Sequence, residues 1–144
     1  RNLIKNKPLL ESSVRQQEAA IHSAFDECFV AGYAPLIPGL TLPDEDDRHV
    51  LAAAIKCSAQ IIVTENHKDF PAETLEEYGI ETRGADNFLA NTYDLFPKSG
   101  ARVLKQIRQR YDSPPFTRSE FLMDLIKSGM PKLAALARTD IEYL

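Results

Sequence analysis

The clearest pattern of apolar and polar residues lies near the middle of the chain. Apolar residues first recur at the spacing of one face of a helix and then form an unbroken β-branched run at residues 61–63. The helical positions are Val50, Leu51, Ala54 and Ile55. An unbroken apolar run is typical of a strand buried on both faces of a parallel sheet. The pattern predicts a helix over about residues 46–58 and a strand over about 60–64.

The part of the chain before this pattern has weaker signals. Ser12 or Ser13 is a candidate helix cap, and Gln16 stands at the capping-box spacing from Ser13. The helix that they introduce carries an apolar face to about residue 29, made of Val14, Ile21, Phe25, Cys28 and Phe29. Glycines and prolines between residues 32 and 43 exclude a long regular element there. A short edge strand at residues 30–33 fits the remaining space.

The part after the pattern continues as alternating helix and strand up to Pro97. Pro71 suits the start of a helix that ends at Gly79, residues 80–83 form a brief strand, and Asp86 is a candidate cap for the next helix. This alternation predicts an α/β fold. From Pro97 onward only helical patterns occur, with a capping box at Thr117 and Glu120 and with Gly129 and Pro131 as boundaries. We therefore predict an α/β domain at residues 1–96 and an all-helical extension at 97–144.

The length of 144 residues suits one compact domain with a helical extension, and the content of apolar and charged residues is ordinary for a globular protein. No apolar run approaches the ~20 residues of a membrane span. The two cysteines, Cys28 and Cys57, lie in apolar helical patterns, so we expect buried free thiols and a cytoplasmic protein. Phosphate-binding glycine loops, a GxSxG elbow and zinc-ligand spacings are absent from the sequence.

The charge of the chain has two sides. The net charge of −4 argues against a non-specific coat for nucleic acids but leaves a nuclease possible, because cations neutralise acids at a metal site. A helical pattern after Pro97 carries a basic face made of Lys98, Arg102, Lys105, Arg108 and Arg110. This face is either solvated, a contact for the RNA backbone, or a contact for an acidic protein.

Candidate chemistry gathers around the central pattern. Four consecutive acids, residues 44–47, precede the predicted helix, where carboxylates are favoured by the helix dipole. Capping explains one or two of these acids well and four poorly, because their mutual repulsion grows with each addition. The alternative explanation is that the acids bind a hard cation such as Mg²⁺. Thr64, Asn66 and Asp69 follow the predicted strand, and ligands of α/β sheets bind beyond the carboxyl ends of strands.

The string DDRHVLAAAIKCSAQIIVTENHKDFP at residues 46–71 resembles the third and fourth motifs of PIN domains, the ribonuclease fold of VapC-type toxins. In that family an Asp opens a helix of small apolar residues, which Asp47 matches. The following strand ends in Thr, a variable residue and Asp or Asn, and Asp-Phe comes soon after, as at Thr64, Asn66 and Asp69. The sequence from residue 79 to the C-terminal helices resembles the PIN subgroup that has an extra helical tail.

The resemblance implies the roles of individual residues. Asp47 matches the third acid and Asp69 the fourth, and both would bind Mg²⁺ or Mn²⁺. Asp44 would be an auxiliary acid, and Asn66 is a neutral departure that holds such a cation less strongly than a carboxylate. Thr64 would orient a water or a carboxylate through its hydroxyl group. Three further residues flank this site and either contact substrate phosphates or are surface residues: Arg48, His67 and Lys68.

The resemblance also implies a PIN-like parallel sheet flanked by helices, RNA as substrate, a cognate antitoxin, and a homodimer. The expected first strand with its Asp and the helix with the second acid have no counterpart after Arg1. We therefore expect a chain that lacks the first strand, is inactive by itself, and associates with itself through unpaired sheet edges. The alternative is a truncated or degenerate PIN fold that binds protein or nucleic acid and cuts nothing.

Overall fold

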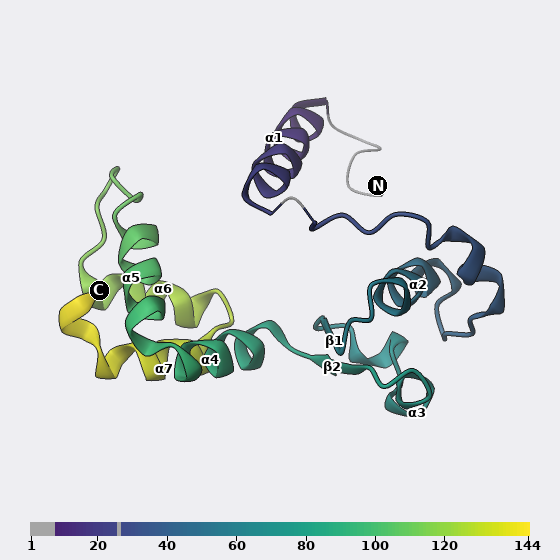
Figure 1. The fold of residues 1–144 in the computed structure, drawn as a ribbon. Coiled ribbons are helices and arrows are strands. Elements are labelled where there is room, and N and C mark those ends of the chain that lie inside the picture. The colour runs from purple at the N-terminus through teal and green to yellow at the C-terminus, as the bar shows by residue number, and fades with distance from the viewer. Residues whose placement is uncertain (1–7, 26) are drawn as a thin grey trace. The chain divides into compact units, whose positions relative to one another are not determined.

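The computed structural model describes residues 8–25 and 27–144. The chain divides into two compact units, Arg1–Ala59 and Gln60–Leu144. Figure 1 labels the helices and strands. In the first unit the helix α1 spans Pro8–Ala24, the 3-10 helices η1 and η2 span Ala34–Gly39 and Glu45–Asp47, and the helix α2 spans Arg48–Lys56. α2 packs against both η1 and η2. The buried apolar residues of this unit are Leu40, Leu42, Leu51, Ala52 and Ala54.

Three predictions for the first unit are wrong in detail. Ser12 and Ser13 lie inside α1 and do not cap it, because the helix already begins at Pro8, a residue favoured in the first turn of helices. α1 ends at Ala24, so the predicted apolar face is shorter than expected, and Phe25 and Phe29 are exposed. Residues 30–33 form no strand, since Gly32 has a left-handed φ of +72° that interrupts an extended backbone.

The cysteines also differ from expectation. Both thiols are free, as predicted, but both side chains are exposed and not buried. Cys57 directly follows the last residue of α2, and Cys28 lies in the irregular segment after α1. Neither cysteine lies on a packed helix face, so the apolar helical patterns around them wrongly predicted that they are buried.

The second unit begins with a small parallel sheet. The strand β1 spans Ile61–Val63 and pairs with β2, which spans Glu81–Arg83, in the register Ile61 to Glu81. η3 (His67–Asp69) and the helix α3 (Ala72–Glu76) connect the two strands, and α3 packs against β2. The parallel sheet flanked by helices and followed by a helical region confirms the predicted fold class.

The burial of β1 corrects one prediction. Ile62 is only 7% exposed, whereas the side chain of Val63 is 44% exposed. Successive side chains of a strand point to opposite faces of the sheet, so one face of β1 is covered and the other is open. The unbroken apolar run therefore does not mark a strand buried on both faces.

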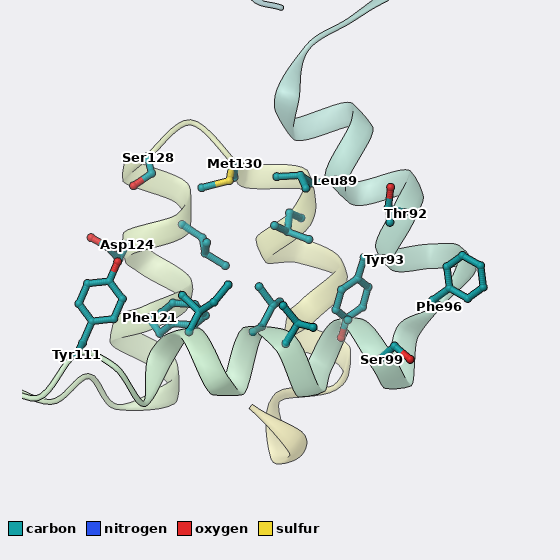
Figure 2. A pocket seen from close by; sticks show the side chains of 16 residues that line it. Leu89, Thr92, Tyr93, Phe96, Ser99, Tyr111, Phe121, Asp124, Ser128 and Met130 are labelled. Carbon is teal, nitrogen blue, oxygen red and sulfur yellow. The ribbon is translucent and has the colours of Figure 1, made fainter. Parts of the chain in front are cut away.

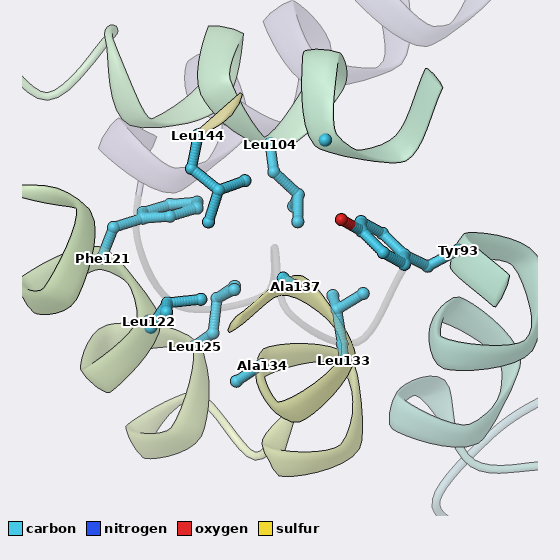
Figure 3. Close-up of a cluster of buried hydrophobic side chains, with 10 residues drawn as sticks. Tyr93, Leu104, Phe121, Leu122, Leu125, Leu133, Ala134, Ala137 and Leu144 are labelled. Atoms are coloured by element: carbon cyan, nitrogen blue, oxygen red, sulfur yellow. The ribbon is translucent and has the colours of Figure 1, made fainter. Parts of the chain in front are cut away.

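Four helices and a short 3-10 helix complete the second unit. They are α4 (Ala85–Leu95), α5 (Pro97–Arg108), α6 (Arg118–Lys127), α7 (Pro131–Thr139) and η4 (Ile141–Tyr143). α7 packs against α4 and α6, and α5 packs against α4 and η4. Their core is shown in Figure 3 and consists of Tyr93, Ala101, Leu104, Phe121, Leu122, Leu125, Leu133, Ala134, Ala137 and Leu144.

Capping groups fix the ends of these helices. The predicted capping box is confirmed: the Glu120 N–H donates to Thr117 Oγ1 at 3.2 Å, and the Thr117 N–H donates to Glu120 Oε2 at 2.8 Å. Asp86 does not cap its own helix, whose N-cap is Gly84. Its carboxylate instead accepts the backbone N–H groups of Lys132 and Leu133, each at 3.0 Å, at the start of α7.

The boundary that we predict between residues 96 and 97 stays a prediction about domain organisation. α4 lies on its N-terminal side, and Tyr93 of α4 belongs to the same core as Leu104 of α5 and Leu133 of α7. The helical packing of the second unit therefore already includes α4. Among the described helices, none has the length and apolar content that crossing a membrane requires.

Candidate functional site

The first group of candidate residues lies in the acidic turn before α2. Asp44 is the N-cap of η2, and its Oδ1 accepts the N–H of Asp46 at 2.9 Å. Asp47 is the last residue of η2, directly precedes α2, and is half-buried. Capping therefore explains the presence of Asp44, which is one of the four consecutive acids.

Arg48 stands beside these acids at the first position of α2. Its guanidinium forms an ion pair with Glu45 at 3.0 Å and also donates to the Glu45 carbonyl at 3.1 Å. The Arg48 side chain is 25% exposed and that of Glu45 is 79% exposed. The ion pair holds the Arg48 guanidinium at the edge of the acidic turn.

The second group follows β1. The backbone N–H of Thr64 donates to the Arg83 carbonyl at 2.9 Å, which ties the end of β1 to β2. Thr64 Oγ1 accepts the N–H of Asn66 at 3.0 Å and so closes the turn. A hydroxyl group that accepts one hydrogen bond still has its own proton to donate, so Thr64 is able to orient a carboxylate or a water.

Asp69 ends η3 and is half-buried, next to the buried Phe70. Lys68 Nζ lies 4.0 Å from Asp69 Oδ2, and the Lys68 side chain is 84% exposed. The Asp69 side chain is 16% exposed, and a long ion pair with such an exposed lysine contributes little. His67 of the same turn contacts Thr82 of β2, with 3.0 Å between Nδ1 and Oγ1.

Sequence reasoning missed Glu65, which occupies the variable position of the motif. Its carboxylate accepts the N–H of Ala85 at 2.7 Å and so holds the first turn of α4 against the loop after β1. Gly84 lies under this carboxylate, and a Cβ there would stand 3.1 Å from both Glu65 oxygens. Nothing local in the sequence indicates this contact, because Glu65 and Ala85 are twenty residues apart.

Each of the two groups by itself carries oxygen donors that suit a hard divalent cation. Asp44, Asp47 and Asp69 offer carboxylate oxygens, and Asn66 offers an amide oxygen, which are the ligands that Mg²⁺ and Mn²⁺ take. Asp47 and Asp69 are half-buried, so each carboxylate is partly desolvated and still reachable from solvent. Thiol and imidazole ligands for a softer metal are not part of this set.

A separate feature of the second unit is an apolar cavity of about 490 Å³ (Figure 2). Side chains from α4, α5 and α6 and from the start of α7 line it, among them Leu89, Phe96, Val103, Phe121 and Met130. Asp124 is the one charged residue among those that line it and is half-buried. The sequence patterns of these helices do not predict this cavity.

Comparisons with known proteins give two matches. The family model described as the VapC50 C-terminal domain matches residues 85–139. Over 110 residues the chain is 38% identical to a Mycobacterium tuberculosis protein named "Putative ribonuclease VapC50". This alignment covers 76% of the chain and 64% of that protein, so the chain spans less than two thirds of the relative's length. No solved structure matches the chain.

Proposed function

We propose that the chain belongs to the VapC-like PIN toxin family and that it is part of a metal-dependent endoribonuclease, the toxin of a toxin–antitoxin pair. The observation that carries this proposal is the identity to a relative named as a ribonuclease. The parallel sheet with Thr64, Asn66 and Asp69 beyond the end of β1 supports it. A fold alone would not, because one fold hosts many functions.

We assign the roles of the acidic residues as follows. Asp47 and Asp69 are ligands of Mg²⁺ or Mn²⁺, and Asp44 and Asn66 are auxiliary oxygen donors. When bound, the cation polarises the phosphodiester and lowers the pKa of a coordinated water. Thr64 donates its hydroxyl proton to a carboxylate or a water and keeps it oriented, since its oxygen is already fixed by the Asn66 N–H.

The cationic side chains of the same segments bind the substrate. Arg48 presents a planar guanidinium that suits a phosphate, and Lys68 presents an exposed ammonium group. His67 adds an imidazole held at Thr82. Together they would hold the RNA backbone by charge and contact no base edge, so they contribute affinity and not sequence preference.

Cleavage of a mixed pool of structured RNA in Mn²⁺ by the natural full-length protein tests this proposal. Asp47→Asn should lower the rate by at least 100-fold, which corresponds to about 2.7 kcal/mol of lost transition-state stabilisation. Asp46→Asn is the matched control, because it removes the same charge from the exposed neighbouring residue of the same turn. Equal activity of the Asp47→Asn variant and the wild type would refute the assignment, provided that circular dichroism shows both folded.

The proposed partners follow from the same family. We propose RNA as substrate, a cognate antitoxin that blocks the acidic residues, a homodimer, and a cytoplasmic location. Unpaired sheet edges favour further association, and β1 has a neighbouring strand on one edge only within residues 8–25 and 27–144. A monomer in light scattering at high concentration would contradict the self-association.

The apolar cavity favours a second candidate function, a non-catalytic binding module. Its charge pattern fits an amphipathic helix of a partner protein that carries one Lys or Arg on its apolar side, because Asp124 would pair with that cation. In the described part of the chain, the Asp124 carboxylate has neither a hydrogen bond nor an ion pair. Metal-independent binding of such a helix by a protein that cleaves no RNA would favour this candidate over the nuclease.

A further inference from the structure

The basic helix α5 presents a cationic surface that the proposed active site does not use. The stretch from residue 95 to residue 111 contains five Lys and Arg residues and no acidic residue. The structure separates these five into two groups. Arg108 turns inward, where its guanidinium donates to the carbonyl of Phe116 at 2.7 Å and to that of Leu144 at 3.5 Å. Arg108 therefore supports the fold and is not part of the basic surface.

Three of the remaining cations line one cavity. Lys98, Arg102 and Lys105 follow at intervals of four and three residues, which places them on one face of α5. Together with Asp140 and Tyr143 they line a cavity of about 600 Å³. The helix rises roughly 10 Å from the first of these cations to the last. The row is therefore long enough to contact several successive phosphates and is longer than a site for a single anion.

The cations of this cavity are not neutralised by the protein. Within the described part of the chain, Lys98, Arg102 and Lys105 have no carboxylate within ion-pair distance. The one acid of the lining is Asp140. Its Oδ2 accepts a hydrogen bond from the Tyr93 hydroxyl group, with 2.8 Å between the two oxygens. Three cations against one occupied carboxylate leave the cavity positive in a chain whose net charge is −4.

An exposed aromatic ring stands beside these cations. Tyr143 belongs to η4, which packs against α5, and its side chain is 67% exposed. An acidic protein segment would need the charges and has no use for an exposed ring. Single-stranded nucleic acids use both, because phosphates bind to cations and a base stacks on an aromatic side chain.

We infer that this cavity binds a single-stranded segment of RNA, with Lys98, Arg102 and Lys105 at phosphates and Tyr143 stacked on a base. The inference rests on the proposed function in that it takes RNA as the polyanion. It adds a binding surface on the helical part of the chain that holds substrate outside the acidic residues. The fixed cations would add affinity, and the ring would favour unpaired over paired RNA.

The test is fluorescence anisotropy of the full chain with a labelled oligouridine in EDTA, which measures binding without cleavage. Arg102→Gln combined with Lys105→Gln should weaken binding and make the plot of log affinity against log salt less steep by about 1.4, since each lost phosphate contact changes the slope by about 0.7. Lys127→Gln combined with Arg138→Gln removes the same charges from exposed positions elsewhere and should leave this slope unchanged.

The ring has its own matched pair of variants. Tyr143→Leu should weaken binding by on the order of ten-fold, whereas Tyr143→Phe keeps the stacking surface and should bind like the wild type. The inference would be overturned if the two double variants lost RNA affinity equally. It would also be overturned if Tyr143→Leu bound RNA like the wild type. Competition by polyglutamate as effective as that by RNA would overturn it as well and would indicate an acidic protein partner.

Cleavage assays keep this inference separate from the proposed function. RNA binding that depends on these residues, in a protein that cleaves nothing in Mn²⁺, would remove the nuclease and leave the binding surface. Cleavage that depends on Asp47, with binding unaffected by the α5 and Tyr143 variants, would remove the binding surface and leave the nuclease.

Discussion

Asp86 offers the sharpest test of the packing between α4 and α7. Its two carboxylate oxygens accept the N–H groups of Lys132 and Leu133, each at 3.0 Å, across 46 and 47 residues of sequence. The first N–H groups of a helix have no partner within the helix, so Asp86 supplies the cap of α7 from a different helix. Asp86→Ala removes both acceptors at once.

The expected loss follows from this geometry. Replacing a capping Asp by Ala costs about 0.5–2 kcal/mol in helices whose ends are solvated. The residue Leu133 is only 5% exposed, so its N–H would be left with poor access to water, which places the cost near the upper end, at about 2 kcal/mol. For a unit of this size, each kcal/mol lowers Tm by about 4–8 °C, so a decrease of roughly 8–16 °C is expected.

Amide hydrogen exchange locates the effect. Asp86→Ala should speed exchange of the Lys132 and Leu133 amides, while the first amides of α4 keep their protection. Asp94→Ala is the control, because Asp94 is exposed and lies in the same helix. Faster exchange at the start of α4 alone would mean that Asp86 caps its own helix, as its sequence position suggests, and would refute the cross-helix cap.

Three further predictions concern the same unit. Gly100→Ala should lower the free energy of unfolding by at least about 1 kcal/mol, seen as a lower urea midpoint, because the new Cβ would lie 2.5 Å from Cδ2 of Tyr93. This clash should outweigh the helix propensity of Ala, which favours Ala over Gly by about 1 kcal/mol. Burial, and then the hydrogen bond and charge of Asp140, raise the pKa of Tyr93 above its usual 10.0. The stability that this provides is therefore complete below pH 10 and declines as pH rises above it, and Tyr93→Phe should flatten that decline in alkaline thermal melts. The hydrogen bonds from the side chain and backbone of Thr117 lower the pKa of Glu120, so its contribution is present above the usual 4.5 and is lost as pH falls below it; Glu120→Gln should unfold with a weaker dependence on acid pH. Unchanged pH profiles in either variant would contradict these assignments.

Local sequence signals predicted much of the second unit. The strands at 61–63 and 81–83, the left-handed backbone of Gly79 and the capping box of Thr117 and Glu120 all depend on contacts within a few residues or on the backbone preferences of one residue. α3 itself ends at Glu76, before the predicted end at Gly79. Such features are set by nearby side chains and by φ angles, so a sequence contains them directly. The acidic turn before α2 and the polar loop after β1 were found in the same way.

Only the tertiary structure decided which distant groups meet. Asp86 was the predicted cap of its own helix, yet it lies inside that helix and caps α7. Arg108 belongs to a basic sequence pattern, yet its guanidinium donates to two backbone carbonyls, and Glu65 holds α4 from the loop after β1. The roles of Asp47 and Asp69 stay a prediction from the family motif. The sequence by itself determined where most helices and strands of the second unit lie, because these depend on local hydrogen bonds and backbone preferences. The partners of each polar side chain depend on where folding brings the elements together, and no local pattern contains that information.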